Sequence, residues 1–293
     1  MPKFSCGVKI LGMKKLQKNW LYQKTVIISG ASGGLGFNLA KVLIEKYDCT
    51  ILGIARNEEK ILKNIQTLDN KKSNFRYFLF DVSIKQNWED FCLKLENEGI
   101  VPDLLINNAG FMLPFEKFED NNDSDIQKII NTNFTSYVNS VKTLLPLLKK
   151  SNTPAIVNVA SSSALCPVVG QTMYSATKFA LRGFTEALIQ EYKKNVYIGG
   201  VYPGFIKTDI MSNTQMSDKS RSLVDKVMMP VEKAANKIIK RISKKKKTII
   251  TGFDGKFMGF FGRLFPKTTS SIITFVLRKS GLDLFKNLFK ENK

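Results

Sequence analysis

The regular alternation of short apolar runs with longer amphipathic runs is the feature of this sequence that most constrains its fold. The apolar runs are rich in β-branched residues and have the length of strands, whereas the amphipathic runs repeat apolar residues at helical spacing. Strands that alternate with helices pair in parallel through right-handed crossovers, so helices must cover both faces of the sheet. The sequence therefore predicts an α/β fold of the Rossmann type, a doubly wound parallel sheet of about seven strands with helices on both faces.

The predicted elements follow one another without a linker or an internal repeat. Strands are expected at residues 25–29, 49–54, 75–80, 104–106, 155–159, 197–201 and 248–251. Helices are expected at residues 36–47, 57–68, 85–98, 124–149 and 174–193, with a polar, irregular flap at 207–229. We therefore expect one Rossmann-type domain at residues 25–251, a basic extension at 1–24, and a Phe-rich extension at 252–293 that packs on the same domain or on a partner.

The chain contains no histidine, which excludes Ser-His-Asp and Cys-His mechanisms and most zinc sites. Proton chemistry must then use Tyr, Lys, Asp, Glu or Cys side chains, and no metal site is expected. The four cysteines lie far apart and form no CxxC pair, as is typical of reduced thiols in a cytosolic protein. No apolar stretch is long enough for a signal peptide or a membrane-spanning helix, so a cytoplasmic location is expected.

The formal net charge is +20, from 45 basic and 25 acidic residues. Such a charge attracts anionic partners such as nucleic acids, membranes or phosphorylated ligands, but a lysine-rich solvated surface explains it equally well. The cations are dispersed along the chain, apart from a run at residues 240–247, and no nucleic-acid-binding module is recognised. We therefore expect no nucleic-acid partner.

A glycine cluster separates the first predicted strand from the first predicted helix. Glycines at such a turn let the backbone approach a pyrophosphate, which then lies at the positive end of the helix. Glycine clusters also occur in ordinary turns, but the position within the first βαβ unit favours dinucleotide binding. The residues expected to contact the cofactor here are Gly30, Ser32, Gly34, Leu35 and Gly36.

The end of the second predicted strand indicates which dinucleotide is bound. NAD sites have an acidic residue there that holds the ribose 2′-hydroxyl, whereas a 2′-phosphate is accommodated by a cation. This chain has Arg56 at that place and no acid, and Ser32 is available as a further contact. A solvated arginine at a helix start is the alternative interpretation. We expect NADP(H) to be preferred over NAD(H).

Tyr174 and Lys178 are four residues apart in a predicted helix, which places them on one helical face. A free tyrosine has a pKa of about 10 and is a poor base at neutral pH. A neighbouring ammonium group favours the phenolate, so we expect Lys178 to lower the pKa of Tyr174 toward the working range. The pair is therefore a candidate for proton transfer.

Four motifs occur in a fixed order, each at the expected end of a strand or start of a helix. They are the glycine cluster, Asn107-Asn108-Ala109-Gly110, Tyr174-Ser175-Ala176-Thr177-Lys178 and Pro203-Gly204. The arrangement extends over about residues 24–251. It resembles the short-chain dehydrogenase/reductase family in its compact single-domain branch.

The resemblance implies roles for the catalytic residues. Tyr174 would donate a proton to the carbonyl oxygen of the substrate. Lys178 would lower the pKa of that tyrosine and hold the nicotinamide ribose. Ser161, which lies 13 residues before the tyrosine, would donate a hydrogen bond to the reacting oxygen, with Ser162 and Ser163 as rivals.

Further site residues also follow from the resemblance. Asn133 would hold a water molecule in the proton relay, with Asn131 as a weaker candidate. Asp81 and Val82 would contact adenine, and Thr208 would hold the carboxamide. The remaining residues expected at the cofactor are Asn108, Ala109, Gly110, Pro203, Gly204 and Ile206. The chain departs from the common pattern at Ser29, Ser136 and Ala160, and the change at Ser136 weakens the assignment of Asn133.

The expected function is that of an NADP(H)-dependent oxidoreductase that reduces a carbonyl to a secondary alcohol, or catalyses the reverse reaction. A hydrophobic substrate such as a steroid or long-chain ketone is favoured. The alternative substrate is a 3-oxoacyl thioester, and the alternative of another class is a catalytically silent NADP-binding regulator. A homodimer or homotetramer is expected.

The C-terminal segment, residues 252–293, holds 8 of the 21 phenylalanines, in stripes at helical spacing. It also carries 8 basic and 3 acidic residues. Three interpretations remain open for it. The stripes can form core or subunit contacts, cover a greasy substrate pocket, or make a peripheral contact with an anionic membrane.

Overall fold

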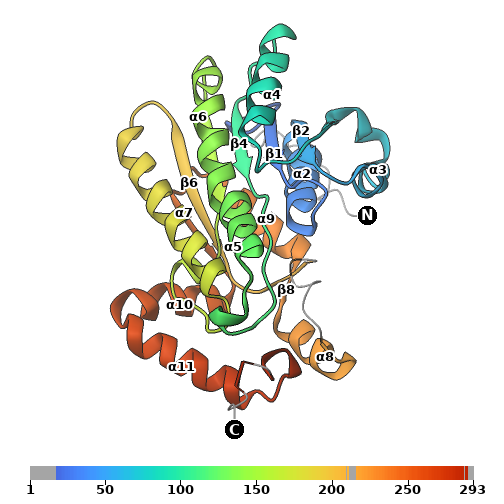
Figure 1. The fold of residues 1–293 in the computed structure, drawn as a ribbon. Helices are drawn as coiled ribbons and strands as arrows, with labels where there is room; N and C mark the ends of the chain where they lie inside the picture. Colours follow the sequence, from blue (N-terminus) through green and yellow to red (C-terminus); the bar gives the residue numbers. More distant parts are fainter. Residues whose placement is uncertain (1–17, 209, 211–215, 287, 290–293) are drawn as a thin grey trace, which may run out of the picture.

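The computed structural model describes residues 18–208, 210, 216–286 and 288–289, which fold around a central parallel sheet (Figure 1). The seven strands pair in the order β3-β2-β1-β4-β5-β6-β9. Their bounds are β1 (Thr25–Ser29), β2 (Thr50–Ala55), β3 (Phe75–Leu79), β4 (Leu104–Asn107), β5 (Ala155–Val159), β6 (Tyr197–Pro203) and β9 (Thr248–Thr251). Every pairing is parallel, so the predicted Rossmann-type fold is confirmed.

Helices cover both faces of this sheet, and each face has its own apolar core cluster. The helices of the first cluster are α2 (Gly34–Tyr47), α3 (Glu58–Gln66) and α9 (Val231–Ile242). The helices of the second cluster are α4 (Lys85–Asn97), α6 (Ser136–Leu148) and α7 (Thr172–Glu191). Figure 1 shows α6 and α7 in front of the sheet and α9 behind it. The order of the strands reverses between β1 and β4, and ligands of such sheets bind at the carboxyl ends of the strands beside this switch point.

The long helix predicted at residues 124–149 is present, but a π-helical turn divides it into two α-helices. It consists of α5 (Asp123–Ile130), a π-helical turn η3 (Asn131–Thr135) and α6. Single π-turns within α-helices occur frequently at functional sites, because they redirect side chains and leave backbone groups for other partners. The turn contains Asn133, the residue to which the family resemblance gives a catalytic role.

Two parts of the chain differ from the prediction. The segment 207–229, expected to be irregular, contains α8 (Asp218–Val227) and the strands β7 (Ile206–Lys207) and β8 (Met229–Pro230), which pair with each other. Residues 209 and 211–215 of this segment lie outside the described residues. The helix α9 has no predicted counterpart, although its buried apolar residues are at helical spacing.

The C-terminal segment forms two helices and a short 3-10 turn. These are α10 (Phe253–Leu264), α11 (Pro266–Lys279) and η6 (Asp283–Phe285). Pro266 ends one stripe of phenylalanines but also begins α11, because a first helical position tolerates the missing N–H of proline. Both helices lie below the sheet in Figure 1, at the same end of the molecule as α8.

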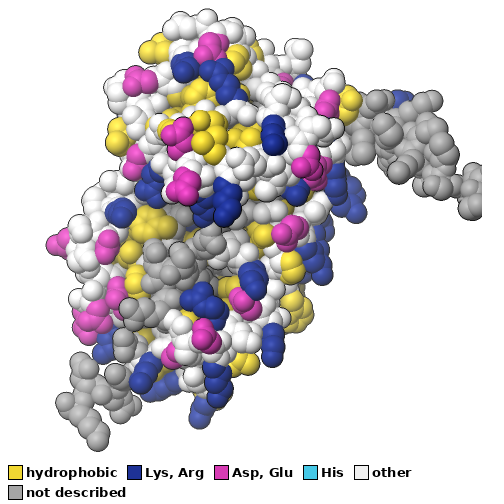
Figure 2. Space-filling model, turned by 90° about the vertical axis from the view of Figure 1, so that its right-hand side faces the viewer, with side chains coloured by type: hydrophobic (Ala, Val, Ile, Leu, Met, Phe, Trp, Pro, Cys, Tyr) yellow, Lys and Arg dark blue, Asp and Glu magenta, His cyan; other side chains and the backbone are white. Residues whose placement is uncertain are grey.

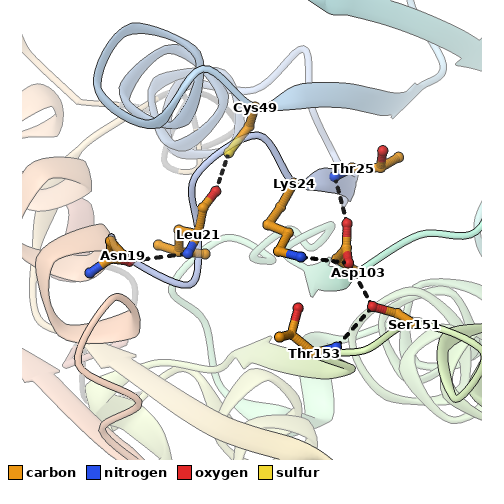
Figure 3. Close-up of polar contacts among 8 residues, drawn as sticks. All are labelled: Asn19, Leu21, Lys24, Thr25, Cys49, Asp103, Ser151 and Thr153. Carbon is orange, nitrogen blue, oxygen red and sulfur yellow. Dashed lines mark hydrogen bonds and ion pairs between the residues drawn. The ribbon is translucent and has the colours of Figure 1, made fainter. Parts of the chain in front are cut away.

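A polar network connects the amino ends of β1, β4 and β5, at the end of the sheet opposite the carboxyl ends of the strands (Figure 3). The carboxylate of Asp103, just before β4, pairs with Lys24 Nζ at 3.2 Å and accepts a hydrogen bond from the backbone N–H of Thr25 at 3.0 Å. The Ser151 hydroxyl, which precedes β5, donates to the same carboxylate at 2.6 Å. Leu21 is fully buried in the first core cluster, so residues 18–24 of the predicted N-terminal extension pack on the domain. Residues 1–17 of that extension lie outside the described residues.

The surface charge is dispersed on the face drawn in Figure 2, where Lys and Arg side chains are scattered and acidic side chains lie among them. The positive charge on that face does not gather into one patch. Among the described residues, no helix is both long enough and apolar enough to cross a membrane.

Candidate active site

A cavity of about 460 Å³ lies at the carboxyl ends of the strands, beside the switch point. Its walls come mainly from the segments that follow β1, β2, β3, β4, β5 and β6, and from the start of α7. Nearly all the residues predicted for the site border it. The exceptions are Asp81 and Asn133.

The glycine turn between β1 and α2 has a conformation that requires glycine. Gly30 has a φ of +67°, in the left-handed region that other residues rarely adopt. A Cβ added to Gly36 would lie 2.2 Å from the carbonyl oxygen of Gly30, so no side chain fits there. The N-terminus of α2 has no side-chain cap, which leaves backbone N–H groups directed at the cavity. These features fit a pyrophosphate group.

The loop after β4 is fastened to this turn by hydrogen bonds. The Ser29 hydroxyl oxygen accepts bonds from the backbone N–H groups of Asn108 and Ala109, at 3.0 and 3.1 Å. The amide of Asn108 donates to the carbonyl oxygens of Ser29 and Gly30. The side chain of Asn108 thus holds the turn in shape. Serine in place of the family's commoner threonine keeps the hydroxyl that makes these contacts.

Two cations border the cavity at the end of β2. Arg56 was expected there, and Lys60, in the first turn of α3, was not. The Arg56 side chain is 61% exposed, and its guanidinium lies 3.8 Å from the carboxylate of Asp81. No acidic residue follows β2 before α3 begins. The arrangement offers positive charge where a ribose 2′-phosphate would lie.

The carboxylate of Asp81 faces Arg56 and its own loop, whereas its neighbour Val82 borders the cavity. Asp81 accepts hydrogen bonds from the backbone N–H and the hydroxyl of Ser83, at 2.9 and 2.8 Å. Partial burial works against ionisation, but these bonds and the Arg56 charge outweigh it and hold the pKa of Asp81 below its usual range. The Asp81 carboxylate therefore lies beside Arg56 rather than against the cavity.

Three of the four predicted catalytic residues, Ser161, Tyr174 and Lys178, border the cavity together. Tyr174 and Lys178, both in α7, are 6% and 3% exposed, and Lys178 Nζ lies 5.5 Å from the centre of the Tyr174 ring. Ser161 follows β5 and interacts with the Tyr174 hydroxyl. Its rivals Ser162 and Ser163 also border the cavity, but both are buried, whereas Ser161 is half-buried. The geometry therefore favours Ser161.

The pKa values of the pair differ from the expectation for Tyr174. Burial raises the pKa of Tyr174 to about 12, and the hydrogen bond with Ser161 only partly opposes it. Burial also lowers the pKa of Lys178 to about 7. The pKa of Tyr174 is therefore shifted in the direction opposite to the one expected from Lys178 alone. Desolvation penalises the charged form of both groups, so burial shifts the two pKa values toward each other.

Asn133 is fully buried in the π-turn, and its amide is occupied by one backbone segment. The amide oxygen accepts from the backbone N–H of Phe111 at 3.0 Å, and the amide nitrogen donates to the Phe111 carbonyl at 2.8 Å. A Cβ on Gly110 would lie 3.1 Å from the same amide. The side chain therefore fixes the loop after β4. The weaker candidate, Asn131, accepts a bond from Gln127 and does not border the cavity.

Comparison with known proteins decides the family. The model of the short chain dehydrogenase family matches residues 24–219, about two thirds of the chain. This protein belongs to the short-chain dehydrogenase family. It is therefore an oxidoreductase that acts on CH–OH or carbonyl groups with a nicotinamide dinucleotide.

Its relatives include enzymes of different specificity. A 3-oxoacyl-[acyl-carrier-protein] reductase of Chlamydia pneumoniae is 32% identical over 197 residues, which cover 66% of this chain and 77% of that protein. An NADPH-dependent pterin aldehyde reductase of Arabidopsis thaliana is 28% identical over 190 residues, covering 65% and 78%. A short-chain dehydrogenase from Burkholderia cenocepacia, solved with NADP, superposes with a TM-score of 0.71 at 20% identity, covering 86% and 98% of the two chains.

The loop after β6 of this dehydrogenase is held by a residue that the sequence analysis did not identify. Asp254, in the first turn of α10, accepts a hydrogen bond from the backbone N–H of Phe205 at 2.6 Å. A Cβ on Gly204 would lie 2.2 Å from that carboxylate, so Gly204 is required for the contact. The predicted cofactor residues Pro203, Gly204, Ile206 and Thr208 lie at the end of β6 or shortly after it, and all of them border the cavity. The start of the Phe-rich segment thus positions the cofactor loop.

The remaining wall of the dehydrogenase cavity is mainly apolar and was not predicted. It also holds Gln171, which is 3% exposed and donates to the carbonyl oxygens of Leu113 and Pro114 at 2.8 and 3.1 Å. The apolar residues that border this part are Met112, Phe115, Val168, Ile210 and Met228. They come from several separate segments, so no short motif could reveal them.

Proposed function

We propose that this dehydrogenase uses NADP(H) to interconvert a hydrophobic carbonyl compound, such as a steroid or long-chain ketone, and its secondary alcohol. One observation carries the proposal. Ser161, Tyr174 and Lys178 border a single cavity, between the glycine turn on one side and an apolar wall on the other. A dinucleotide and a greasy substrate can therefore meet at these three side chains.

The preference for NADP(H) is supported by charge. Arg56 and Lys60 border the cavity after β2, where an NAD site would have an acid, and Ser32 borders the same part. The names of the Arabidopsis relative and of the Burkholderia structure, which mention NADPH and NADP, point the same way. The further cofactor contacts that we propose are Gly30, Gly34, Leu35, Gly36, Val82, Asn108, Ala109, Gly110, Tyr174, Lys178, Pro203, Gly204, Ile206 and Thr208. Asp81 would act by orienting Arg56.

The proposed mechanism uses the protonation states that burial sets. The nicotinamide, when bound, supplies or accepts the hydride. Tyr174, with its pKa near 12, is protonated at neutral pH and can donate its proton to the carbonyl oxygen, while Ser161 donates a hydrogen bond to the same oxygen. Lys178, with its pKa near 7, can exchange a proton at neutral pH beside that ring. Asn133 supports the site by fixing the loop at Phe111.

The substrate class is supported by the apolar wall. Met112, Phe115 and Val168 offer contacts to carbon skeletons rather than to the hydroxyls of a sugar. The second candidate is a 3-oxoacyl thioester, which the similarity to the Chlamydia reductase favours. Both substrates present a ketone at the end of a long apolar body.

An activity panel tests the function. The purified protein is mixed with NADPH or NADH and with steroid ketones, long-chain ketones, 3-oxoacyl thioesters and small carbonyls, and the absorbance of the reduced nicotinamide is followed. We expect NADPH to be consumed fastest with an apolar ketone. Tight NADPH binding without turnover of any carbonyl would instead support the catalytically silent regulator.

The organisation of the molecule is part of the proposal. We propose a catalytic domain at residues 25–251 with the Phe-rich extension packed on it, a cytoplasmic location, and a homodimer or homotetramer. The outer face of α7 exposes small and apolar side chains, which suits close packing of two copies. These residues are Ala176, Phe179, Ala180 and Gly183. Sedimentation velocity of the full chain checks the subunit count.

A further inference from the structure

The outer face of α10 is apolar, although it is exposed. Phe253, Phe260 and Leu264 are 87%, 62% and 56% exposed, and they follow one stripe of the helix together with Phe257 and Phe261. The inner face already packs on the domain through buried residues, so the fold does not need the outer stripe. Phe261 contacts Phe257 and Phe260, with ring centres 4.8 and 5.1 Å apart.

The apolar surface continues over the turn and onto α11. We call it the α10–α11 surface, formed by Phe253, Phe260, Phe261, Leu264, Phe265, Ile272, Phe275 and Val276. These are eight of the eighteen large apolar side chains that are exposed in the described part of the chain, and they lie within two consecutive helices or, for Phe265, between them. Exposed apolar residues at such density mark a contact surface, whereas scattered ones do not.

The charges on the same two helices have one sign. Between residues 253 and 279 there are five basic residues, which are Lys256, Arg263, Lys267, Arg278 and Lys279. The only acid of that segment is Asp254, and its carboxylate is engaged by the backbone N–H of Phe205. Aromatic side chains flanked by cations are the composition of helices that lie in the interface of an anionic membrane.

We propose that the α10–α11 surface docks on an anionic phospholipid bilayer, with both helices lying in its interface and neither crossing it. The charges favour a bilayer over a second copy of the chain, because a symmetric contact would bring the basic groups of both copies together. The inner side of these helices shares an apolar cluster with the substrate wall, through Met258, Phe115 and Val168. Docking would therefore place the substrate side of the enzyme next to the membrane. The docking does not depend on the proposed reaction.

Vesicle co-sedimentation of the full-length protein tests this proposal. The vesicles are made of phosphatidylcholine alone or of phosphatidylcholine mixed with phosphatidylserine. We expect the protein to pellet with the mixed vesicles, much less with neutral ones, and less at high salt, because screening weakens the attraction. Protein that stays in the supernatant with the mixed vesicles at low salt would overturn the proposal.

Two double variants, one on the α10–α11 surface and one elsewhere as its control, test the apolar contact. Phe260→Ser with Leu264→Ser should lower the apparent partition coefficient at least about tenfold, whereas Phe118→Ser with Leu93→Ser should leave it unchanged. The four side chains have similar exposure, between 55% and 62%, so each pair removes a comparable apolar area. Equal binding of the two double variants would contradict the proposal.

A second comparison separates local charge from net charge. Lys256→Glu with Arg263→Glu should weaken binding to the mixed vesicles more than Lys233→Glu with Lys237→Glu in α9, although both pairs change the net charge equally. None of these residues borders the cavity, so NADPH turnover without vesicles should stay at the wild-type level and report correct folding. If the serine pair at Phe260 and Leu264 changes the subunit count in light scattering and leaves vesicle binding intact, the surface is a contact between copies and the proposal fails.

Discussion

The two halves of the cavity are built by different means. The cofactor half is shaped largely by backbone and small residues, such as Gly30 and Gly36, and hydrogen bonds join this glycine turn to the loop after β4. The substrate half consists of side chains such as Met112, Val168 and Met228, which come from distant segments. A substitution in the cofactor half can abolish cofactor binding, because the turn has only one suitable conformation. A substitution in the substrate half can change which substrate fits, because its lining is made of side chains. A short motif can therefore reveal a cofactor site and still say little about the substrate.

The largest effect on NADPH affinity is expected from a methyl group in the glycine turn. The Cβ of Gly36→Ala would lie 2.2 Å from the Gly30 carbonyl oxygen, so the turn must shift, and we expect NADPH affinity to fall at least about 100-fold. Glu45→Ala, on the exposed side of α2, is the control in the same helix, since Glu45 does not border the cavity and alanine favours a helix. Calorimetric titration with NADPH gives both affinities, and normal affinity of Gly36→Ala would show that the turn is not the pyrophosphate site.

Lys178 lies where the two halves meet, and its burial makes stability depend on pH. The pKa of Lys178 is about 7 in the folded protein and about 10.5 in the unfolded chain. Below pH 7 the buried amine is charged, and this lowers the free energy of unfolding. The cost disappears as the pH rises from about 7 to about 10.5. Lys178→Met should remove this cost and raise the free energy of unfolding at pH 6.5 by about a few kcal/mol. The gain should vanish near pH 10.5. Urea unfolding at several pH values measures it, and a pH-independent difference would mean that the lysine is not desolvated.

A moderate effect is expected at the end of β2. Arg56→Asp removes the cation that lies beside Asp81 and places a negative charge where we expect the 2′-phosphate. NADPH affinity should fall by roughly 1.5–3 kcal/mol, which is about 10–100-fold, while NADH affinity changes little. The ratio of kcat/KM with the two cofactors reports the preference. A ratio that stays at the wild-type value would assign the phosphate to other residues, with Lys60 first among them.

The smallest effect is expected in the substrate half. Met228→Ala shortens a side chain of the apolar wall and should lower kcat/KM for a bulky ketone by roughly 1 kcal/mol, about fivefold. Small carbonyls and NADPH affinity should be little affected. If NADPH affinity falls as far as kcat/KM does, the two halves are not independent.

The same contrast explains what could be predicted from the sequence. The parallel sheet and its strands were predictable because fully buried strands are continuous apolar runs. The residues of the cofactor half were predictable because the motif positions Gly30 to Gly36 are adjacent in the chain. The helices α8 and α9 were missed in a polar region, although α9 has a regular stripe that includes Ile238 and Ile242.

Other features depend on packing and could not be derived from spacing. Asp254 faces Phe205 across 49 residues of sequence, and only the fold brings them together. The direction of the Tyr174 pKa shift was misjudged because the spacing of four residues shows proximity but not burial. Burial is the larger cause here, and it depends on every element around the site.

The central claim is that Tyr174 donates the proton, whereas other residues hold the cofactor. The Tyr174→Phe variant tests this claim most directly, because it removes one oxygen atom at the point where the two halves meet. Turnover of the best ketone and the NADPH dissociation constant are measured on the same preparation. We predict that turnover falls at least about 1000-fold, since the proton donor is lost, while NADPH affinity stays within about threefold of wild type. A variant that keeps more than a small fraction of wild-type turnover would contradict the account.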